Sequence, residues 1–301
     1  MQSHLSTEFL DTRLLSRLPS IEVRAKYLVD GFLVGLHKSP YQGSSVEFKE
    51  YRDYQPGDDL KWIDWKVYAR TDRLHVRLRE DETNMTVYML VDQSASMNYR
   101  GAGAMMTKWA YTQSLAAAFL LFLHRQRDCV SLSFAGNGLT DYTPRSSKSY
   151  HFHQMMGNLH RAADHMESRL ADSLSQLILE VRRRSIVILF SDFYEDVDAL
   201  EPLIAHLRFL NCEILFLHVA DPGELEMDMD DAVLLQDMES QRQLLLSPDL
   251  IRKEYNARIQ QHLEDLSAML RRHGGDYLLL PTDTLPIQAL GAYLSQREAK
   301  R

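Results

Sequence analysis

From about residue 84 onward, short apolar runs alternate with longer amphipathic stretches, and this alternation is the strongest constraint on the fold. The apolar runs are rich in Val, Ile and Leu, as in strands buried on both faces, and lie at 86–92, 129–135, 185–192, 213–221 and 276–281. The stretches between them predict helices at 104–127, 151–163, 170–183, 197–210, 249–273 and 285–298. The pattern predicts an α/β fold with helices on both faces of a doubly wound, mainly parallel sheet.

The rest of the chain divides into segments of different character. We expect an N-terminal helical segment at 1–40, a charged β-rich segment at 41–83 and the α/β domain at 84–301. An acidic insertion near 221–247 interrupts the alternation, and we expect a loop or a short hairpin there.

Residues 47–82 combine many charges with many aromatic side chains. Half of these residues are charged, and Pro56-Gly57 fits the central positions of a type II turn. One interpretation is a sheet surface with ion pairs and cross-strand aromatic contacts. The other is a partner-docking surface, since Trp, Tyr and Arg are frequent interface anchors. Its candidate anchors are Tyr54, Trp62, Trp65 and Arg70.

Composition and charge exclude several classes of function. The formal net charge of −8 argues against binding to nucleic acid or to an anionic membrane surface. The longest apolar run, 115–123, is too short to span a bilayer, and the N-terminus lacks the features of a signal peptide. We therefore expect a cytoplasmic protein without a membrane contact.

Polar side chains follow two of the predicted strands. Asp92 ends the run "TVYMLVD" and is followed by Ser94 and Ser96, while Asp192 follows "SIVILFS". Ligands of parallel α/β sheets bind outside the carboxyl ends of the strands, so these groups converge if the two strands are neighbours. Carboxylate and hydroxyl oxygens suit Mg²⁺ or Mn²⁺ better than zinc. A helix-capping role for the carboxylates is the simpler alternative.

Two sets of residues resemble a known family. "VDQSASM" and "LFSDF" resemble the metal-ion-dependent adhesion site (MIDAS) of von Willebrand factor A domains. "GSSVEFKEYRDYQPGDDLKWIDWKVYARTDRLHVR" resembles the signature of the bacterial family called domain of unknown function 58. The resemblance covers roughly residues 40–300. It implies a von Willebrand factor A-like, Rossmann-like α/β domain.

The resemblance also implies roles for individual residues. Asp92, Ser94 and Ser96 correspond to the first metal loop, and Asp192 corresponds to the third. The second loop normally supplies a threonine after two glycines, whereas the matching position here is Ser168. Thr143 is the alternative second-loop ligand.

The family resemblance implies a non-enzymatic adaptor or co-chaperone that works with a MoxR-type AAA+ ATPase. The ion would bridge to a carboxylate of the partner through an open coordination position. A hydrolase or phosphotransferase dependent on Mg²⁺ or Mn²⁺ is the main alternative. The haloacid dehalogenase type needs a second aspartate where this chain has Ser94. A third possibility is an interaction domain in which the metal only stabilises the fold. His218, within an apolar strand, is interpreted as a hydrogen-bonded core residue.

Overall fold

The computed structural model describes residues 12–38, 51–53, 68, 70, 75–77, 85–161, 169–226, 233–236, 243–246 and 248–298. The chain divides into two compact units, one of residues 36–84 and one of residues 1–35 and 85–301. In the smaller unit, β1 (Tyr51–Asp53) pairs antiparallel with β2 (His75–Arg77). This pair fits the β-rich character expected of the charged segment, and the predicted domain limits stay predictions.

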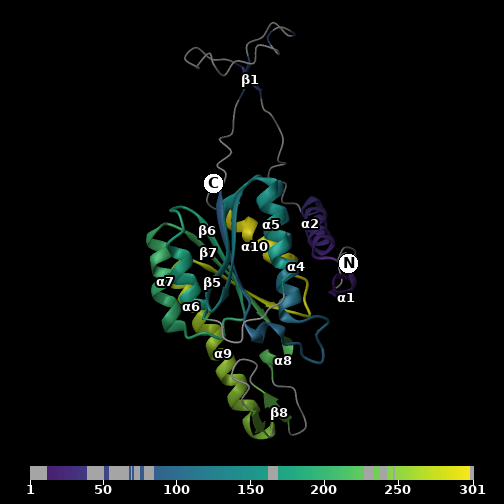
Figure 1. Ribbon diagram of the computed structural model, residues 1–301, viewed down its shortest axis with the longest axis vertical. Coiled ribbons are helices and arrows are strands. Elements are labelled where there is room, and N and C mark those ends of the chain that lie inside the picture. The colour runs from purple at the N-terminus through teal and green to yellow at the C-terminus, as the bar shows by residue number, and fades with distance from the viewer. Residues whose placement is uncertain are drawn as a thin grey trace, which may run out of the picture. The chain divides into compact units, whose positions relative to one another are not determined.

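The larger unit contains a six-stranded sheet of order β10-β7-β6-β3-β4-β5 (Figure 1). Neighbouring strands are parallel except for β5, which runs antiparallel to β4 at the edge. The expected α/β fold with a mainly parallel sheet is confirmed. The strands are β3 (Thr86–Asp92), β4 (Cys129–Gly136), β5 (Gly138–Ser146), β6 (Ile186–Ser191), β7 (Glu213–Ala220) and β10 (Asp276–Pro281).

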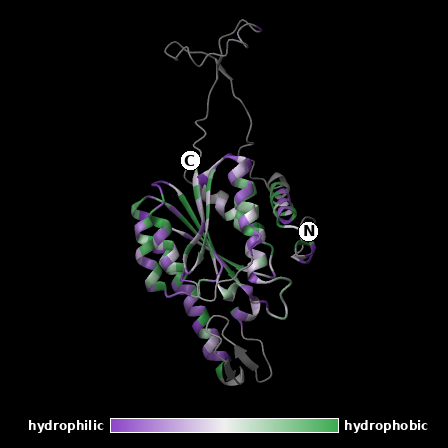
Figure 2. Cartoon of the chain, viewed as in Figure 1, coloured by the Kyte–Doolittle hydropathy of each residue, from purple (hydrophilic) through white to green (hydrophobic). Residues whose placement is uncertain are grey.

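The central strands bury apolar side chains on both faces of the sheet. Along β3, Val87, Met89 and Val91 belong to one hydrophobic cluster, whereas Tyr88 and Leu90 belong to the other. Strands β6 and β7 alternate in the same way, as the period of two in an extended chain requires. The largely green, apolar colour of the central strands in Figure 2 follows from this burial on both faces.

Helices cover the two faces in separate groups (Figure 1). On one face the cluster includes residues of α1 (Thr12–Arg17), α2 (Ile21–Lys38), α4 (Lys108–Arg125), α5 (Ser149–Leu159) and α10 (Ile287–Glu298). On the other face it includes residues of α6 (Leu170–Ile178), α7 (Val197–Phe209) and α9 (Pro248–Arg272). The sheet is therefore doubly wound, as the alternating sequence pattern predicts.

Strand β5 was not among the predicted strands. Its sequence, GLTDYTPRS, is polar and half-buried, and its pairing with β4 contains register shifts. An antiparallel edge strand needs only one apolar face and tolerates proline, so it lacks the continuous apolar run that marks the central strands. The helix predicted from 104 begins at Lys108, where the Thr107 side chain accepts a hydrogen bond from the Ala110 N–H.

The acidic insertion contains a short helix and two short strands. Helix α8 (Pro222–Leu225) follows β7, and β8 (Val233–Gln236) pairs antiparallel with β9 (Gln243–Leu246) before α9 begins. The described part of the insertion thus includes an antiparallel strand pair, which fits the expected hairpin. No helix among the described residues has both the length and the apolar character required to cross a bilayer.

Candidate functional site at the ends of β3 and β6

The two predicted aspartates lie at the carboxyl edge of the sheet, at the ends of neighbouring strands. Strands β3 and β6 are parallel neighbours, with Val91 opposite Phe190. Asp92 ends β3 and Asp192 follows β6, and each is only 3% exposed. After β3 the chain adds β4 and β5 on one side and then crosses to β6 on the other. Such a switch in strand order is where open α/β sheets bind their ligands.

The Asp92 carboxylate is fixed by two hydrogen bonds. Its Oδ1 accepts a bond of 2.9 Å from the Ser94 N–H, a geometry that aspartate commonly makes with the backbone two residues on. Its Oδ2 accepts a bond of 2.6 Å from the Ser191 hydroxyl, which itself accepts a bond of 2.9 Å from the Phe193 N–H. Asp92 is thereby tied to both strand ends.

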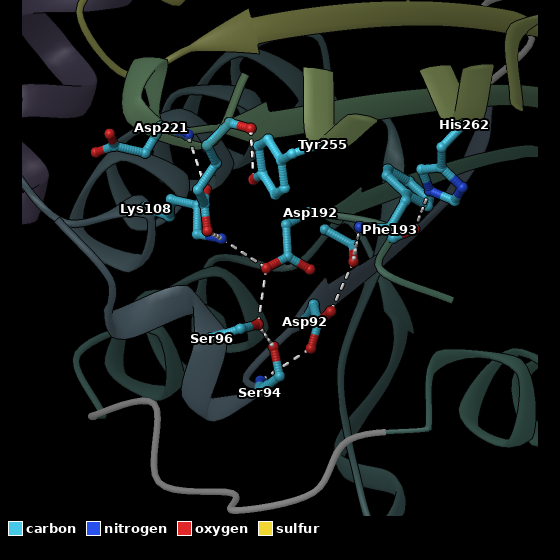
Figure 3. Close-up of polar contacts among 11 residues, drawn as sticks. Asp92, Ser94, Ser96, Lys108, Asp192, Phe193, Asp221, Tyr255 and His262 are labelled. Carbon is cyan, nitrogen blue, oxygen red and sulfur yellow. Dashed lines mark hydrogen bonds and ion pairs between the residues drawn. The ribbon is translucent and has the colours of Figure 1, made fainter. Parts of the chain in front are cut away.

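The two serine hydroxyls connect this loop to Asp192 (Figure 3). Ser94 Oγ and Ser96 Oγ are 2.9 Å apart, and Ser96 Oγ donates a hydrogen bond of 2.7 Å to Asp192 Oδ2. Ser96 lies within the turn of 3₁₀ helix at Ala95–Asn98, which brings its side chain back to the side of Ser94. The structure thus brings Asp92, Ser94, Ser96 and Asp192 together.

A buried lysine is part of the same cluster. Lys108, the first residue of α4, is 0% exposed, and its ammonium donates to Asp192 Oδ2 at 2.8 Å and to Glu224 Oε1 at 2.7 Å. Its Nζ also lies 5.1 Å from the ring centre of Tyr194 and 6.0 Å from that of Tyr99. Glu224 is held by a capping box at the start of α8.

Asp192 and Lys108 keep each other ionised despite burial. Burial alone would raise the pKa of Asp192, but the charge of Lys108 and hydrogen bonds from Lys108 and Ser96 hold it below its usual value. Burial would likewise lower the pKa of Lys108, but the charges of Asp192 and Glu224 raise it. Burial raises the pKa of Glu224 in spite of its contact with Lys108. Asp192 and Lys108 are therefore an ion pair at neutral pH.

The loop after Asp192 has an unusual backbone that is held from both sides. Phe193 has a φ of 50°, which disfavours a side chain with a Cβ, and its ring stacks on Phe216 at 4.4 Å between centres. His262 of α9 donates from Nε2 to the Phe193 carbonyl at 2.9 Å. Tyr255, also of α9, donates to the Glu224 carbonyl at 2.8 Å. Helix α9 thus contacts both flanks of the site.

His218 is a core residue, as expected. It is 2% exposed on β7, its Nδ1 is hydrogen-bonded to the Tyr277 hydroxyl at 2.7 Å, and its ring centre lies 5.4 Å from that of Phe193. Burial lowers its pKa to about 3, so it is neutral at physiological pH.

Of the remaining predicted residues, the structure describes only Arg70 and Thr143. Ser168 lies outside the described residues, as do Tyr54, Trp62 and Trp65. Arg70 is described and exposed. Thr143 lies within β5 opposite Leu132, while Asp92 lies level with Ala135, so Thr143 is well back from the carboxyl edge. Its Oγ1 accepts a hydrogen bond of 3.2 Å from Asn158.

Lys108 and Glu224 were not among the site residues predicted from the sequence. One signal for Lys108 is available in the sequence, because a lysine in the first turn of an apolar helix opposes the helix dipole. Such a residue is expected to have a specific carboxylate partner. Glu224 has a weaker signal, since it stands three residues after Asp221, the acid that ends the β7 run.

The donor set fits a hard cation through hydroxyl and carboxylate oxygens. Within the described part of the chain, no group of three or more His, Cys, Asp and Glu residues could hold a metal ion. A cation here would therefore depend on the serine hydroxyls beside the two aspartates, which suits Mg²⁺ or Mn²⁺ completed by outside oxygens. It would also share Asp192 with the Lys108 ammonium.

Comparisons with known proteins identify relatives without an assigned activity. The family described as "Protein of unknown function DUF58" matches residues 50–265. An uncharacterized protein of Mycobacterium tuberculosis is 29% identical over 286 residues, which cover 93% of this chain and 89% of that protein.

Solved structures similar to this one share little sequence with it. The conserved hypothetical protein BatB from Bacteroides thetaiotaomicron is 11% identical with a TM-score of 0.47, covering 72% of this chain and 100% of that one. The VWA domain of SpRpn10 is 14% identical with a TM-score of 0.43, covering 69% and 94%.

Proposed function

Because this chain belongs to the DUF58 family of proteins of unknown function, we propose its function from the site itself. The chain is a protein-binding domain whose partner docks at the carboxyl ends of β3 and β6. The observation that carries this proposal is the hydrogen-bonded set of Asp92, Ser94, Ser96 and Asp192, four oxygen-bearing side chains from two loops far apart in sequence.

The residues of this set have distinct roles in the proposal. Asp92 is held by Ser94 and Ser191 and supplies fixed negative charge, while the two serine hydroxyls lie near enough to one another to face one ion. Ser96 is half-buried, whereas Asp92, Ser94 and Asp192 are buried, so Ser96 is the most exposed member of the set. A bound Mg²⁺ or Mn²⁺ would supply a positive charge opposite a carboxylate of the partner.

The chemistry of the site fits binding better than catalysis. Catalysis of phosphoryl transfer needs a positioned base or a second acidic group beside the nucleophile. Here Ser94 stands two residues after Asp92, and His218 and His262 are both bound to other groups. The enzymatic alternative predicts phosphoester turnover with Mn²⁺ that Asp92→Asn abolishes, and absence of turnover in the wild type would reject it.

A MoxR-type AAA+ ATPase is the proposed partner. This choice rests on the signature upstream of β3, whose resemblance to the DUF58 family implies a partner of that kind. The test is binding of a purified MoxR-type ATPase from the same cell to the immobilised chain, with Mg²⁺ and with EDTA. Asp92→Asn and Asp172→Asn are compared, since Asp172 is an exposed acid on α6 outside the site. We expect EDTA and Asp92→Asn each to weaken binding at least about ten-fold, and Asp172→Asn to leave it unchanged.

Three results would contradict parts of this proposal. Equal binding under all conditions would remove the bridging role of the metal and move the interface elsewhere, for example to residues 47–82. Loss of far-UV circular dichroism in Asp92→Asn would mean that the aspartate supports the fold. Absence of binding in every condition would reject the ATPase as partner.

A further inference from the structure

The candidate cation site already contains a positive charge that belongs to the chain. We propose that Lys108 sets the affinity of this site for a divalent cation, because its ammonium competes with the ion for Asp192. The inference rests on the proposed function, since both concern the same site. It adds a residue that neither the MIDAS-like motif nor the upstream signature contains.

The competition centres on one oxygen atom. Asp192 Oδ2 accepts hydrogen bonds both from the Lys108 ammonium at 2.8 Å and from the Ser96 hydroxyl at 2.7 Å. An ion that binds between Ser96 and Asp192 must either displace the ammonium or remain within a few ångströms of it. Each event lowers affinity, because like charges repel strongly where water is excluded.

Glu224 determines whether the ammonium can leave. Its Oε1 accepts from Lys108 at 2.7 Å, and its Oε2 accepts from the Asp221 N–H at 3.1 Å (Figure 3). Asp221 in turn accepts from the Gly101 and Gly223 N–H groups at 2.8 and 2.9 Å. Because Glu224 is fixed in this way, it offers the ammonium a second carboxylate when an ion takes Asp192. The Lys108–Glu224 pair thus makes cation binding weak but reversible.

The experiment is isothermal titration calorimetry, in which MgCl₂ is added to the full chain without any partner and the dissociation constant is measured. Four forms are compared: wild type, Lys108→Met, Lys108→Met/Glu224→Gln and Lys148→Met. Lys148 is exposed and follows the end of β5, which pairs with the start of β4 at the edge opposite the site. Lys148→Met removes the same charge as Lys108→Met. The double variant keeps the formal net charge of the wild type.

We expect Lys108→Met and the double variant to bind Mg²⁺ at least about ten-fold more tightly than the wild type, since a unit charge so near a dication matters even at an effective dielectric constant of about 20. Lys148→Met should bind like the wild type. The thermal midpoint should rise more with added Mg²⁺ in the two site variants, because tighter binding to the folded state stabilises it more.

The outcomes separate this inference from the proposed function. Unchanged affinity in the site variants, or an equal gain in Lys148→Met, overturns the role of Lys108 and leaves metal-dependent binding intact. Absence of Mg²⁺ binding in all four forms overturns both. If Lys108→Met alone does not fold, the double variant decides, because only Asp192, rather than both Asp192 and Glu224, is then a carboxylate that has lost the ammonium.

Discussion

The buried His218 gives the most direct test of the electrostatics beneath the site. Its folded pKa of about 3 lies well below the ordinary value of 6.5. Between these values the unfolded chain binds a proton that the folded chain does not, so the free energy of unfolding decreases as the pH falls below 6.5. Each pH unit costs about 1.4 kcal/mol, and a change from pH 6.5 to 4.5 costs about 2.5 kcal/mol.

The assay is urea unfolding followed by circular dichroism at pH 7.5 and pH 4.5. His218→Gln cannot gain the charge, and its amide can still hydrogen-bond to the Tyr277 hydroxyl. Relative to the wild type, the unfolding free energy of His218→Gln should therefore be higher by about 2.5 kcal/mol more at pH 4.5 than at pH 7.5. His206→Gln, on the exposed surface of α7, is the matched control. A difference between His218→Gln and the wild type that is equal at both pH values would refute the reasoning, since His218 would then protonate without unfolding.

Three further predictions concern other parts of the α/β unit. Lys108→Met should lower the unfolding free energy by about 3–5 kcal/mol, measured by urea unfolding at pH 7, because Asp192 and Glu224 lose their shared cation. In the same assay, Lys108→Met/Glu224→Gln should lower the unfolding free energy clearly less. Arg127→Gly should raise the thermal midpoint, with a gain of about 1 kcal/mol, because Arg127 follows the C-cap of α4 with a φ of 60°; equal or lower stability would contradict this. The hydrogen bond with His160 lowers the pKa of the Glu22 carboxylate to about 2, and an NMR titration should give a midpoint near that value that His160→Ala moves back toward 4.5. The contribution of Glu22 to stability should be present above pH 4.5 and should be lost as the pH falls from 4.5 toward 2.

The sequence predicted the parts of the fold that depend on burial. Strands β3 and β10 have the predicted limits, because the apolar run of β3 ends at Asp92 and that of β10 ends at Pro281. Strand β5 was missed because its polar edge sequence lacks that signal. Helix starts were displaced where a cap, such as Thr107, determines the boundary more than periodicity does.

The candidate site was predictable only where strand ends and a known motif coincide. Asp92 and Asp192 could be expected to converge if their strands were neighbours, and the sheet order provides that condition. Lys108 and Glu224 could not be paired from sequence, because their contact depends on how α4 and α8 approach the same edge in space. Whether Ser168 acts as a ligand stays a prediction.

The long separation between the two halves of the site affects how the chain folds. Ser96 and Asp192 are hydrogen-bonded although they lie 96 positions apart, so the site forms only after β6 has inserted beside β3. A chain that has folded only through β5 would contain Lys108 without Asp192 or Glu224, and an ammonium without either carboxylate strongly disfavours burial. The buried charges of the cluster therefore destabilise a chain whose sheet is incomplete. A partner that recognises the assembled strand ends would bind only chains whose folding is complete.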